Sequence, residues 1–370
     1  MSESGSESDT AASTHETVGA AAPALVEVRG LRKQFSIHQS LLRPSKGAVK
    51  AVDGVDLDIV AGETFGLVGE SGCGKSTLGR LLVRLLEPTA GAVRFQGVDI
   101  ARFRGSRLRQ QRADMQMIFQ DPFGSLDPRW RIERAIAEPL RAHGLRGRSQ
   151  LRTRVETLLN AVGLDESMAD RFPHQMSGGQ RQRVGIARAV ALQPKLIVAD
   201  EPVSALDVSV QAQIVNLLMD LQERLGLTYV FVAHGLDVVR HVSTRIGVMY
   251  LGRIVEQAPT ETLFANFAHP YTASLLSAIP AMEQGRRHQR IVLSGEVGSA
   301  ASLPSGCRFH PRCPRRQQRC EVDDPTLREL SPHHFVACHF PLTSRTDRVN
   351  FLATATPRAR PAPKPQEEQP

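Results

Sequence analysis

The order of apolar and polar positions predicts a chain in which short strands alternate with helices. Short β-branched, apolar runs predict strands at Leu25–Val28, Val55–Val60, Thr64–Val68, Ala92–Phe95, Gln116–Phe119, Leu196–Ala199, Tyr229–Ala233 and Gly247–Tyr250. Apolar positions at helical spacing predict helices at Lys75–Leu86, Leu151–Val162, Gln180–Leu192 and Val208–Leu225. Apolar strands separated by helices are typical of an α/β core with a parallel sheet.

The pattern changes near both ends of the chain. Residues 1–24 are polar and contain no Lys or Arg, so they lack the basic start of a secretory signal, and we expect a disordered tail. Beyond about Ala265, Pro, His, Arg and Cys become frequent, which predicts a smaller module over residues 266–345 and a Pro-rich tail over 346–370. No apolar run approaches the roughly 18–20 residues of a membrane-spanning helix.

A phosphate-binding loop is the clearest chemical signal. The pattern G-x-x-x-x-G-K-[ST] is matched by Gly69, Glu70, Ser71, Gly72, Cys73, Gly74, Lys75, Ser76 and Thr77. The motif follows an apolar strand and opens a helix, whose N-terminal N–H groups and dipole favour phosphate. We assign Lys75 to the terminal phosphates of a nucleotide and Ser76 to Mg²⁺. The alternative is an ordinary Gly-rich turn between a strand and a helix.

A buried strand also delivers two carboxylates. Asp200 and Glu201 follow the apolar run Leu196–Ala199. Asp200 suits the Mg²⁺ shell, and Glu201 suits the polarisation of an attacking water. An exposed acidic strand end is the alternative, which the apolar strand and the phosphate loop disfavour.

Four further motifs carry a family resemblance. They are Phe119-Gln120-Asp121-Pro122, Met176-Ser177-Gly178-Gly179-Gln180, Ser204-Ala205-Leu206-Asp207 and His234. With the phosphate loop and the acidic strand, they make the chain resemble the ATPase subunits of ABC transporters from about Leu25 to Cys338. The stretches DPFGSLDPR and HPYTASLLSAIP are most similar to the dipeptide/oligopeptide importer ATPases. The resemblance implies a P-loop NTPase domain of the ABC type over residues 25–265, with an antiparallel β subdomain and a helical subdomain over about 121–178.

The resemblance also implies roles for these residues. Gln120 would touch Mg²⁺ or the attacking water, His234 would contact the γ-phosphate of ATP, and Asp207 would lie at the dimer seam. The signature residues would close over the ATP that another subunit holds. They are Ser177, Gly178, Gly179 and Gln180. For the signature, a simple surface helix cap is the alternative, and for His234 it is a packing role.

An aromatic residue after the first strand is expected to stack on adenine in this family. Phe35 fits, and a core phenylalanine is the competing interpretation. The chain departs from the family at three positions: it has Met176 where the family usually has Leu, Ala233 where Ser is common, and Gly235 where Asp is often found. None of these positions contacts phosphate or Mg²⁺, so we expect a competent ATPase, with Gly235 able to alter its rate.

Charge suggests an acidic partner. Lys and Arg number 46 against 38 Asp and Glu, which gives a formal charge of +8 and favours nucleic acid, a membrane surface or a phosphate ligand. The basic positions Arg102, Arg104, Arg107, Arg109 and Arg112 could contact nucleic acid or anionic lipid. Because only 5% of residues are aromatic, stacking partners are scarce and a solvated helix face is favoured. We therefore expect no nucleic acid partner.

The cysteines divide into one and four. Cys73 stands alone in the phosphate loop, where we expect an inert thiol. The other four cysteines lie close together in the sequence, which indicates a metal site rather than disulfides. They are Cys307, Cys313, Cys320 and Cys338. The gaps are longer than those of usual zinc knuckles, and the resemblance implies a [4Fe–4S] cluster. Zinc stays the alternative, supported by His310, His333, His334 and His339.

The combined prediction is an ATP-binding and ATP-hydrolysing subunit of a membrane importer for di- or oligopeptides. It would act at the cytoplasmic face of the membrane with a second ATPase subunit, identical or not, two permease subunits and an extracytoplasmic solute-binding protein. The expected permease contact includes Pro122, Phe123, Ser125, Leu126, Asp127, Pro128 and Arg129. The rival is a soluble ABC ATPase acting on nucleic acid or ribosomes, which usually has tandem cassettes or long coiled coils. A third possibility, a non-hydrolysing regulatory subunit, is disfavoured by intact Lys75, Glu201 and His234.

Overall fold

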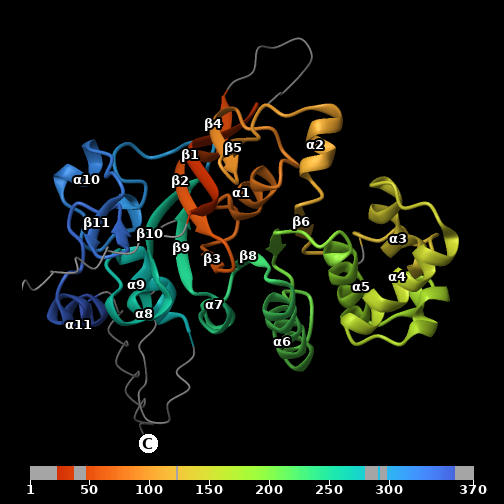
Figure 1. Cartoon of the computed structure of the whole chain (residues 1–370). Coiled ribbons are helices and arrows are strands. Elements are labelled where there is room, and N and C mark those ends of the chain that lie inside the picture. The colour runs from red at the N-terminus through yellow and green to blue at the C-terminus, as the bar shows by residue number, and fades with distance from the viewer. Residues whose placement is uncertain (1–22, 37–46, 122–123, 280–290, 292–297, 355–370) are drawn as a thin grey trace, which may run out of the picture.

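Two β-sheets form the centre of the molecule (Figure 1). The computed structural model describes residues 23–36, 47–121, 124–279, 291 and 298–354. The larger sheet has eight strands in the order β11-β12-β10-β9-β3-β8-β7-β6. Its strands are β3 (Thr64–Val68), β6 (Met115–Ile118), β7 (Leu196–Asp200), β8 (Thr228–Ala233), β9 (Arg245–Tyr250), β10 (Arg253–Pro259), β11 (Arg328–Ser331) and β12 (His334–Val336).

The middle of the larger sheet is parallel, as the alternating pattern predicts. Strands β9, β3, β8, β7 and β6 pair in parallel, and every residue of β3, β7 and β8 is buried. Parallel strands end at one edge of a sheet, which is where ligands bind in open α/β folds. The segments after β3, β6, β7 and β8 therefore meet at a common edge.

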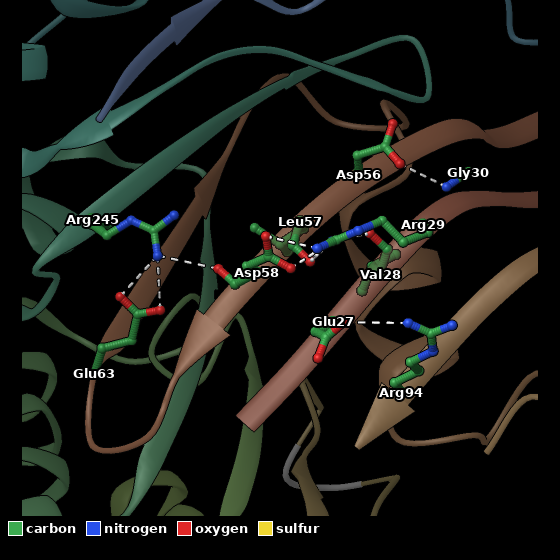
Figure 2. Close-up of polar contacts among 10 residues, drawn as sticks. All are labelled: Glu27, Val28, Arg29, Gly30, Asp56, Leu57, Asp58, Glu63, Arg94 and Arg245. Carbon is green, nitrogen blue, oxygen red and sulfur yellow. Dashed lines mark hydrogen bonds and ion pairs between the residues drawn. The ribbon is translucent and has the colours of Figure 1, made fainter. Parts of the chain in front are cut away.

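The smaller sheet is antiparallel, with the strand order β2-β1-β4-β5. Its strands are β1 (Ala24–Ser36), β2 (Ala48–Val60), β4 (Ala90–Phe95) and β5 (Val98–Asp99). Figure 2 shows polar contacts within this sheet and one residue, Arg245, that joins it to the larger sheet. Arg29 of β1 makes a two-pronged contact with Asp58 of β2, at 2.5 and 3.0 Å. Arg245 of β9 donates to the Glu63 carboxylate at 3.0 and 3.2 Å and to the Asp58 carbonyl at 3.1 Å.

Helices cover the sheets and form a separate projection, which Figure 1 shows at the right. This helical part (residues 124–177) lies between β6 and β7 in the chain. The helices are α1 (Lys75–Leu82), α2 (Gly105–Gln111), α3 (Ile132–Ala142), α4 (Arg148–Ala161), α5 (Gly178–Val190), α6 (Val208–Leu225), α7 (Leu236–Val242), α8 (Thr260–Asn266), α9 (Pro270–Ser277), α10 (Gln318–Val322) and α11 (Arg345–Thr354), with 3-10 turns η1 (Glu166–Asp170), η2 (Pro173–Gln175) and η3 (His310–Arg312). No helix among the described residues combines the length and apolar character needed to cross a membrane.

The predicted ends of some elements are wrong. The first helix stops at Leu82 rather than Leu86, because Arg84 adopts a positive φ of 56° and its guanidinium donates to the carbonyls of Ile100 and Leu86. The predicted strand Gln116–Phe119 is shifted by one residue, to Met115–Ile118.

The C-terminal segment (residues 298–354) packs directly on the larger sheet. Strand β12 pairs with β10, with Glu256 opposite Val336. Phe309, Cys307 and Cys320 belong to the same buried cluster as the parallel strands. The last strands of the chain thus extend the sheet that begins near its N-terminus.

Candidate functional site

The phosphate loop connects β3 to α1 and depends on glycine. Gly74 is the N-cap of α1 with a φ of 109°, and a Cβ added there would lie 2.0 Å from the Ala51 carbonyl oxygen. A Cβ added at Gly69, whose φ is 155°, would lie 2.2 Å from the Met249 carbonyl oxygen. Residues with side chains are excluded from both positions, so the loop can approach a ligand with bare backbone.

Lys75 lies buried in the mouth of this loop. Its Nζ donates to the carbonyl oxygens of Gly69 at 2.7 Å and Glu70 at 3.0 Å. The ammonium group therefore sits at the N-terminus of α1, where the helix dipole also favours an anion. Phosphate oxygens carry full charge and would be stronger partners than these carbonyls.

Ser76 and Asp200 form a pair of oxygen donors beside the lysine. The Ser76 hydroxyl donates to Asp200 Oδ1 at 2.8 Å, and Asp200 is almost fully buried at the end of β7. Hydroxyl and carboxylate oxygens are ligands that Mg²⁺ prefers. These two side chains fit the magnesium role that the sequence predicts for them.

Glu201 is the centre of a second cluster at the same sheet edge. Gln120 Nε2 donates to its Oε2 at 2.7 Å, and His234 Nε2 lies 2.5 Å from its Oε1. The three side chains follow β6, β7 and β8, so the parallel register brings them together. Glu201 also has a φ of 49°, and such strained backbone is concentrated at functional sites. Gln120 contacts Glu201 here rather than the Ser76–Asp200 pair.

The signature residues begin helix α5. Ser177 is the N-cap, with its Oγ accepting from Gln180 N at 3.3 Å while Gln180 Oε1 accepts from Ser177 N at 3.0 Å. Gly179 faces α6, where an added Cβ would lie 2.7 Å from Val210 Cγ1. Gly179 thus lets the start of α5 lie close to α6.

Asp207 lies at the N-terminus of α6, beside the signature. Its carboxylate accepts from Val210 N at 3.0 Å and from the Ser209 hydroxyl at 2.9 Å. These hydrogen bonds hold the pKa of Asp207 below its usual value. In Figure 1, α5 lies beside the helical part, whereas α1 packs against β7 and β8 of the larger sheet and β2 of the smaller one. The signature and the phosphate loop of this chain therefore lie at the starts of helices that pack against different elements.

Phe35 is not a core residue. Its side chain is 40% exposed, and Lys33 Nζ lies 5.1 Å from the ring centroid. The competing interpretation of a buried phenylalanine is therefore wrong. Adenine stacking stays a prediction.

The basic stretch expected near the membrane lies partly on α2, none of whose residues is buried. Arg107 stacks on the Phe103 ring at 3.9 Å, and Arg104 pairs with Glu87 at 2.6 Å. The residues of α2 therefore form a solvent-exposed helix face.

The four clustered cysteines line one small cavity of about 10 Å³. Burial and neighbouring thiols raise the pKa of Cys313 and of Cys338 to about 12. Within the described ranges, no group of three or more His, Cys, Asp or Glu is arranged to hold a metal ion. The lone Cys73 is buried, and burial raises its pKa too.

Three of the four histidines considered for zinc make a polar contact through a ring nitrogen, and two of these three, His310 and His339, also line the cysteine cavity. His334 Nε2 lies 2.7 Å from Glu256 Oε1 in the core. His339 Nε2 lies 2.9 Å from the Asp323 carbonyl oxygen, and His310 Nδ1 lies 3.0 Å from that of Cys307. His334 is therefore engaged away from the cysteines, and zinc at the cavity that His310 and His339 line stays a prediction.

A cleft of about 640 Å³ opens beside Gln120, between the parallel sheet and the helical part. Ser125, from the predicted permease contact, lines it. Leu126 does not belong to an exposed contact, because it is buried in the core. Asp127 pairs with Arg129 at 2.8 Å, and Pro122 and Phe123 lie outside the described residues.

Sequence reasoning missed one contact of the phosphate loop. Arg312, from η3, donates to both Glu70 carboxylate oxygens at 2.7 and 2.9 Å. The Tyr271 hydroxyl accepts from Glu70 N at 2.8 Å. No spacing rule joins these positions, and a lone arginine in a Cys-rich segment gives no signal of its own.

Comparisons with known proteins agree with this geometry. The family model described as "ABC transporter" matches residues 52–204, and that of the "Oligopeptide/dipeptide transporter, C-terminal region" matches residues 255–320. The oligopeptide transport ATP-binding protein AppF of Bacillus subtilis is 50% identical over 318 residues, which cover 85% of this chain and 97% of that protein. The probable peptide ABC transporter ATP-binding protein y4tS of Sinorhizobium fredii is 50% identical over 90% of this chain and 94% of its own length.

Solved structures give the same result for the fold. The dimeric ATP-binding cassette MJ0796, determined with ADP and Pi, is 31% identical with a TM-score of 0.57, over 64% of this chain and 98% of that chain. CbiO1 of Clostridium perfringens, part of an ABC transporter complex, is 27% identical with a TM-score of 0.56, over 65% of this chain and 91% of that chain. The chain belongs to the ATP-binding subunits of ABC transporters, within the group that carries the oligopeptide/dipeptide transporter C-terminal region.

Proposed function

We propose that this ABC ATPase drives import of di- or oligopeptides through a membrane permease. The hydrogen-bonded Gln120–Glu201–His234 cluster, next to Lys75 and the Ser76–Asp200 pair, carries the catalytic part of the proposal. The peptide cargo rests on the relatives named as peptide transport proteins. Their resemblance also favours an importer over a soluble ATPase acting on nucleic acid or ribosomes.

The residues would share the reaction as follows. Lys75 exchanges the Gly69 and Glu70 carbonyls for phosphate oxygens, and Phe35 stacks on adenine. Glu201 accepts a proton from the attacking water while the new P–O bond forms and the bond to ADP breaks. Gln120 and His234 orient the Glu201 carboxylate. A Mg²⁺ ion held by Ser76 and Asp200 would neutralise charge on the phosphates.

Glu201→Gln tests the assignment. Because the amide cannot accept the proton, we expect the ATPase rate to fall about 10²–10⁴-fold while ATP binding persists. Glu223→Gln, at an exposed position of α6, is the matched control, and we expect it to keep wild-type turnover. Hydrolysis by Glu201→Gln at the wild-type rate would remove Glu201 from the mechanism.

A second ATPase subunit would complete each site, with the signature residues of one subunit meeting the nucleotide of the other. The dimeric cassette among the similar structures supports this arrangement. Light scattering of Glu201→Gln with ATP and Mg²⁺ distinguishes a homodimer from a heterodimer. A dimer of this chain alone indicates a homodimer, and dimerisation only after addition of another subunit indicates a heterodimer. A monomer under both conditions contradicts the proposal.

The cleft beside Gln120 would receive the permease at the cytoplasmic membrane face. A side chain that fills it should block docking, and the basal ATPase rate shows whether Gln120, which lines the same cleft, is disturbed. We expect Ser125→Trp to abolish permease-stimulated ATPase activity in reconstituted transporter while basal activity persists. Ser149→Trp, exposed at the start of α4, should keep both activities. Normal stimulation of Ser125→Trp would exclude this cleft.

We further propose that Cys307, Cys313, Cys320 and Cys338 hold a [4Fe–4S] cluster. They supply soft thiol donors around one cavity. The described structure does not arrange them as a metal-binding group, so binding of a cluster requires the thiols to move from their present positions. Anaerobically purified protein should contain iron and sulfide in equal amounts and absorb visible light, and Cys320→Ser should lose both. Stoichiometric zinc without sulfide would contradict the cluster.

A further inference from the structure

We propose that Arg312 of the C-terminal segment is a positioning residue for the phosphate loop and acts through Glu70. The inference rests on the ATPase function above and adds a residue outside the ATPase motifs. Arg312 makes a two-pronged contact with the Glu70 carboxylate, at 2.7 and 2.9 Å. Its side chain is only 7% exposed. Paired, parallel N–H···O bonds fix direction as well as distance.

Glu70 is held at three points. Its carboxylate binds Arg312, its N–H donates to the Tyr271 hydroxyl at 2.8 Å, and its carbonyl accepts from Lys75 Nζ at 3.0 Å. The first two contacts come from parts of the chain beyond the ATPase motifs, and the third reaches the phosphate-binding lysine. The position of Glu70 therefore connects the C-terminal segment to the backbone of the phosphate loop, where Lys75 would bind phosphate.

Arg312 is itself mounted on a rigid base. Its backbone N–H donates to the Phe309 carbonyl at 3.0 Å, and its guanidinium is buried with the nearby aromatic residues. The rings of Phe309, Tyr250 and Tyr271 pack together, with centroids 4.7 to 5.4 Å apart. All three aromatic side chains are almost fully buried. A buried, packed arginine can hold its partner in one orientation.

Charge gives the contact a second effect. A carboxylate in a phosphate loop repels the ligand that the loop binds, and the repulsion is stronger away from water. The guanidinium of Arg312 neutralises Glu70 and orients it toward the C-terminal segment. Without Arg312, the loop would carry an uncompensated negative charge and lose one of its three tethers.

The single variant Arg312→Gln should weaken ATP binding. We expect the KM and the Kd for ATP to rise about tenfold, with kcat changed less than twofold, because Glu201, Gln120 and His234 are untouched. Arg312→Lys keeps the charge but cannot make two parallel hydrogen bonds to Glu70. Its ATP affinity should therefore lie between those of the wild type and Arg312→Gln. Arg319→Gln, an exposed arginine of the same segment that pairs with Asp323, should bind ATP normally.

The double variant separates charge compensation of Glu70 from a merely structural role. Glu70→Gln with Arg312→Gln removes both charges, so the ATP affinity should recover to within about threefold of wild type. If Arg312 only supported folding of the C-terminal segment, the double variant would be as weak as Arg312→Gln. Unchanged KM in Arg312→Gln would also overturn the inference. An inactive wild type would instead refute the proposed ATPase function, so the two failures can be distinguished.

Discussion

Gly74 shows how a single backbone position can determine nucleotide binding. Its φ of 109° favours glycine, and an added Cβ would lie 2.0 Å from the Ala51 carbonyl oxygen. We expect Gly74→Ala to shift the phosphate loop, to lower the free energy of unfolding by about 1–3 kcal/mol and to abolish ATP binding. Thermal unfolding and nucleotide titration of the purified variant measure both effects.

Gly185 provides a control of opposite sign. It lies inside α5, its φ is not positive, and an added Cβ meets nothing within 4 Å. Alanine is the better helix former, so Gly185→Ala should raise the free energy of unfolding by up to about 1 kcal/mol. Equal stability of the two variants would show that steric exclusion at Gly74 has no energetic weight.

At the scale of elements, helix α9 begins at a buried histidine. His269 Nδ1 accepts from Tyr271 N at 3.0 Å and so caps the helix. Burial lowers the pKa of His269 to about 4, against an opposing effect of Glu256. Between about pH 6.5 and 4 the unfolded chain therefore binds a proton that the folded chain does not. The free energy of unfolding must fall as the pH drops through this range.

His269→Asn tests this dependence, because asparagine can cap the helix but cannot titrate. Urea unfolding at pH 7.5 and pH 5 should show the wild type losing about 1–2 kcal/mol more than the variant. If both proteins lost the same stability, other groups would account for the acid sensitivity.

Predictability differs between elements for a physical reason. Every residue of strands β3, β7 and β8 is buried. Their sequences are therefore nearly continuous apolar runs, and such runs predict strands directly. Strand β11 is exposed along its length, and it exists because β12 pairs with β10. Its polar sequence carries no strand pattern.

The candidate site divides in the same way. Lys75, Asp200 and Glu201 belong to short motifs next to apolar strands, and the parallel sheet brings those strand ends together. The contact of Arg312 with Glu70 joins residues 242 positions apart. It depends on the packing of the C-terminal segment, which no local pattern encodes. The sequence thus predicts the reacting groups better than it predicts what positions them.

At the scale of the whole molecule, the C-terminal segment shares one core with the ATPase strands. Phe309 is almost fully buried and lies 5.3 Å from the Tyr250 ring of β9 and 5.4 Å from the Tyr271 ring of α9. Removal of a buried phenylalanine side chain costs about 3–5 kcal/mol. If the segment and the ATPase core unfold together, Phe309→Ala must destabilise both.

The only tryptophan of the chain can report on this coupling. Trp130 lies just before α3 in the helical part, whereas Phe309 lies just before η3 in the C-terminal segment. We expect Phe309→Ala to lower the melting temperature measured by Trp130 fluorescence as much as that measured by circular dichroism. Val322→Ala, a 73% exposed position of the same segment, should leave both unchanged. A Trp130 transition that stays at the wild-type temperature while a second transition moves would show that the predicted module over residues 266–345 unfolds independently of the ATPase core.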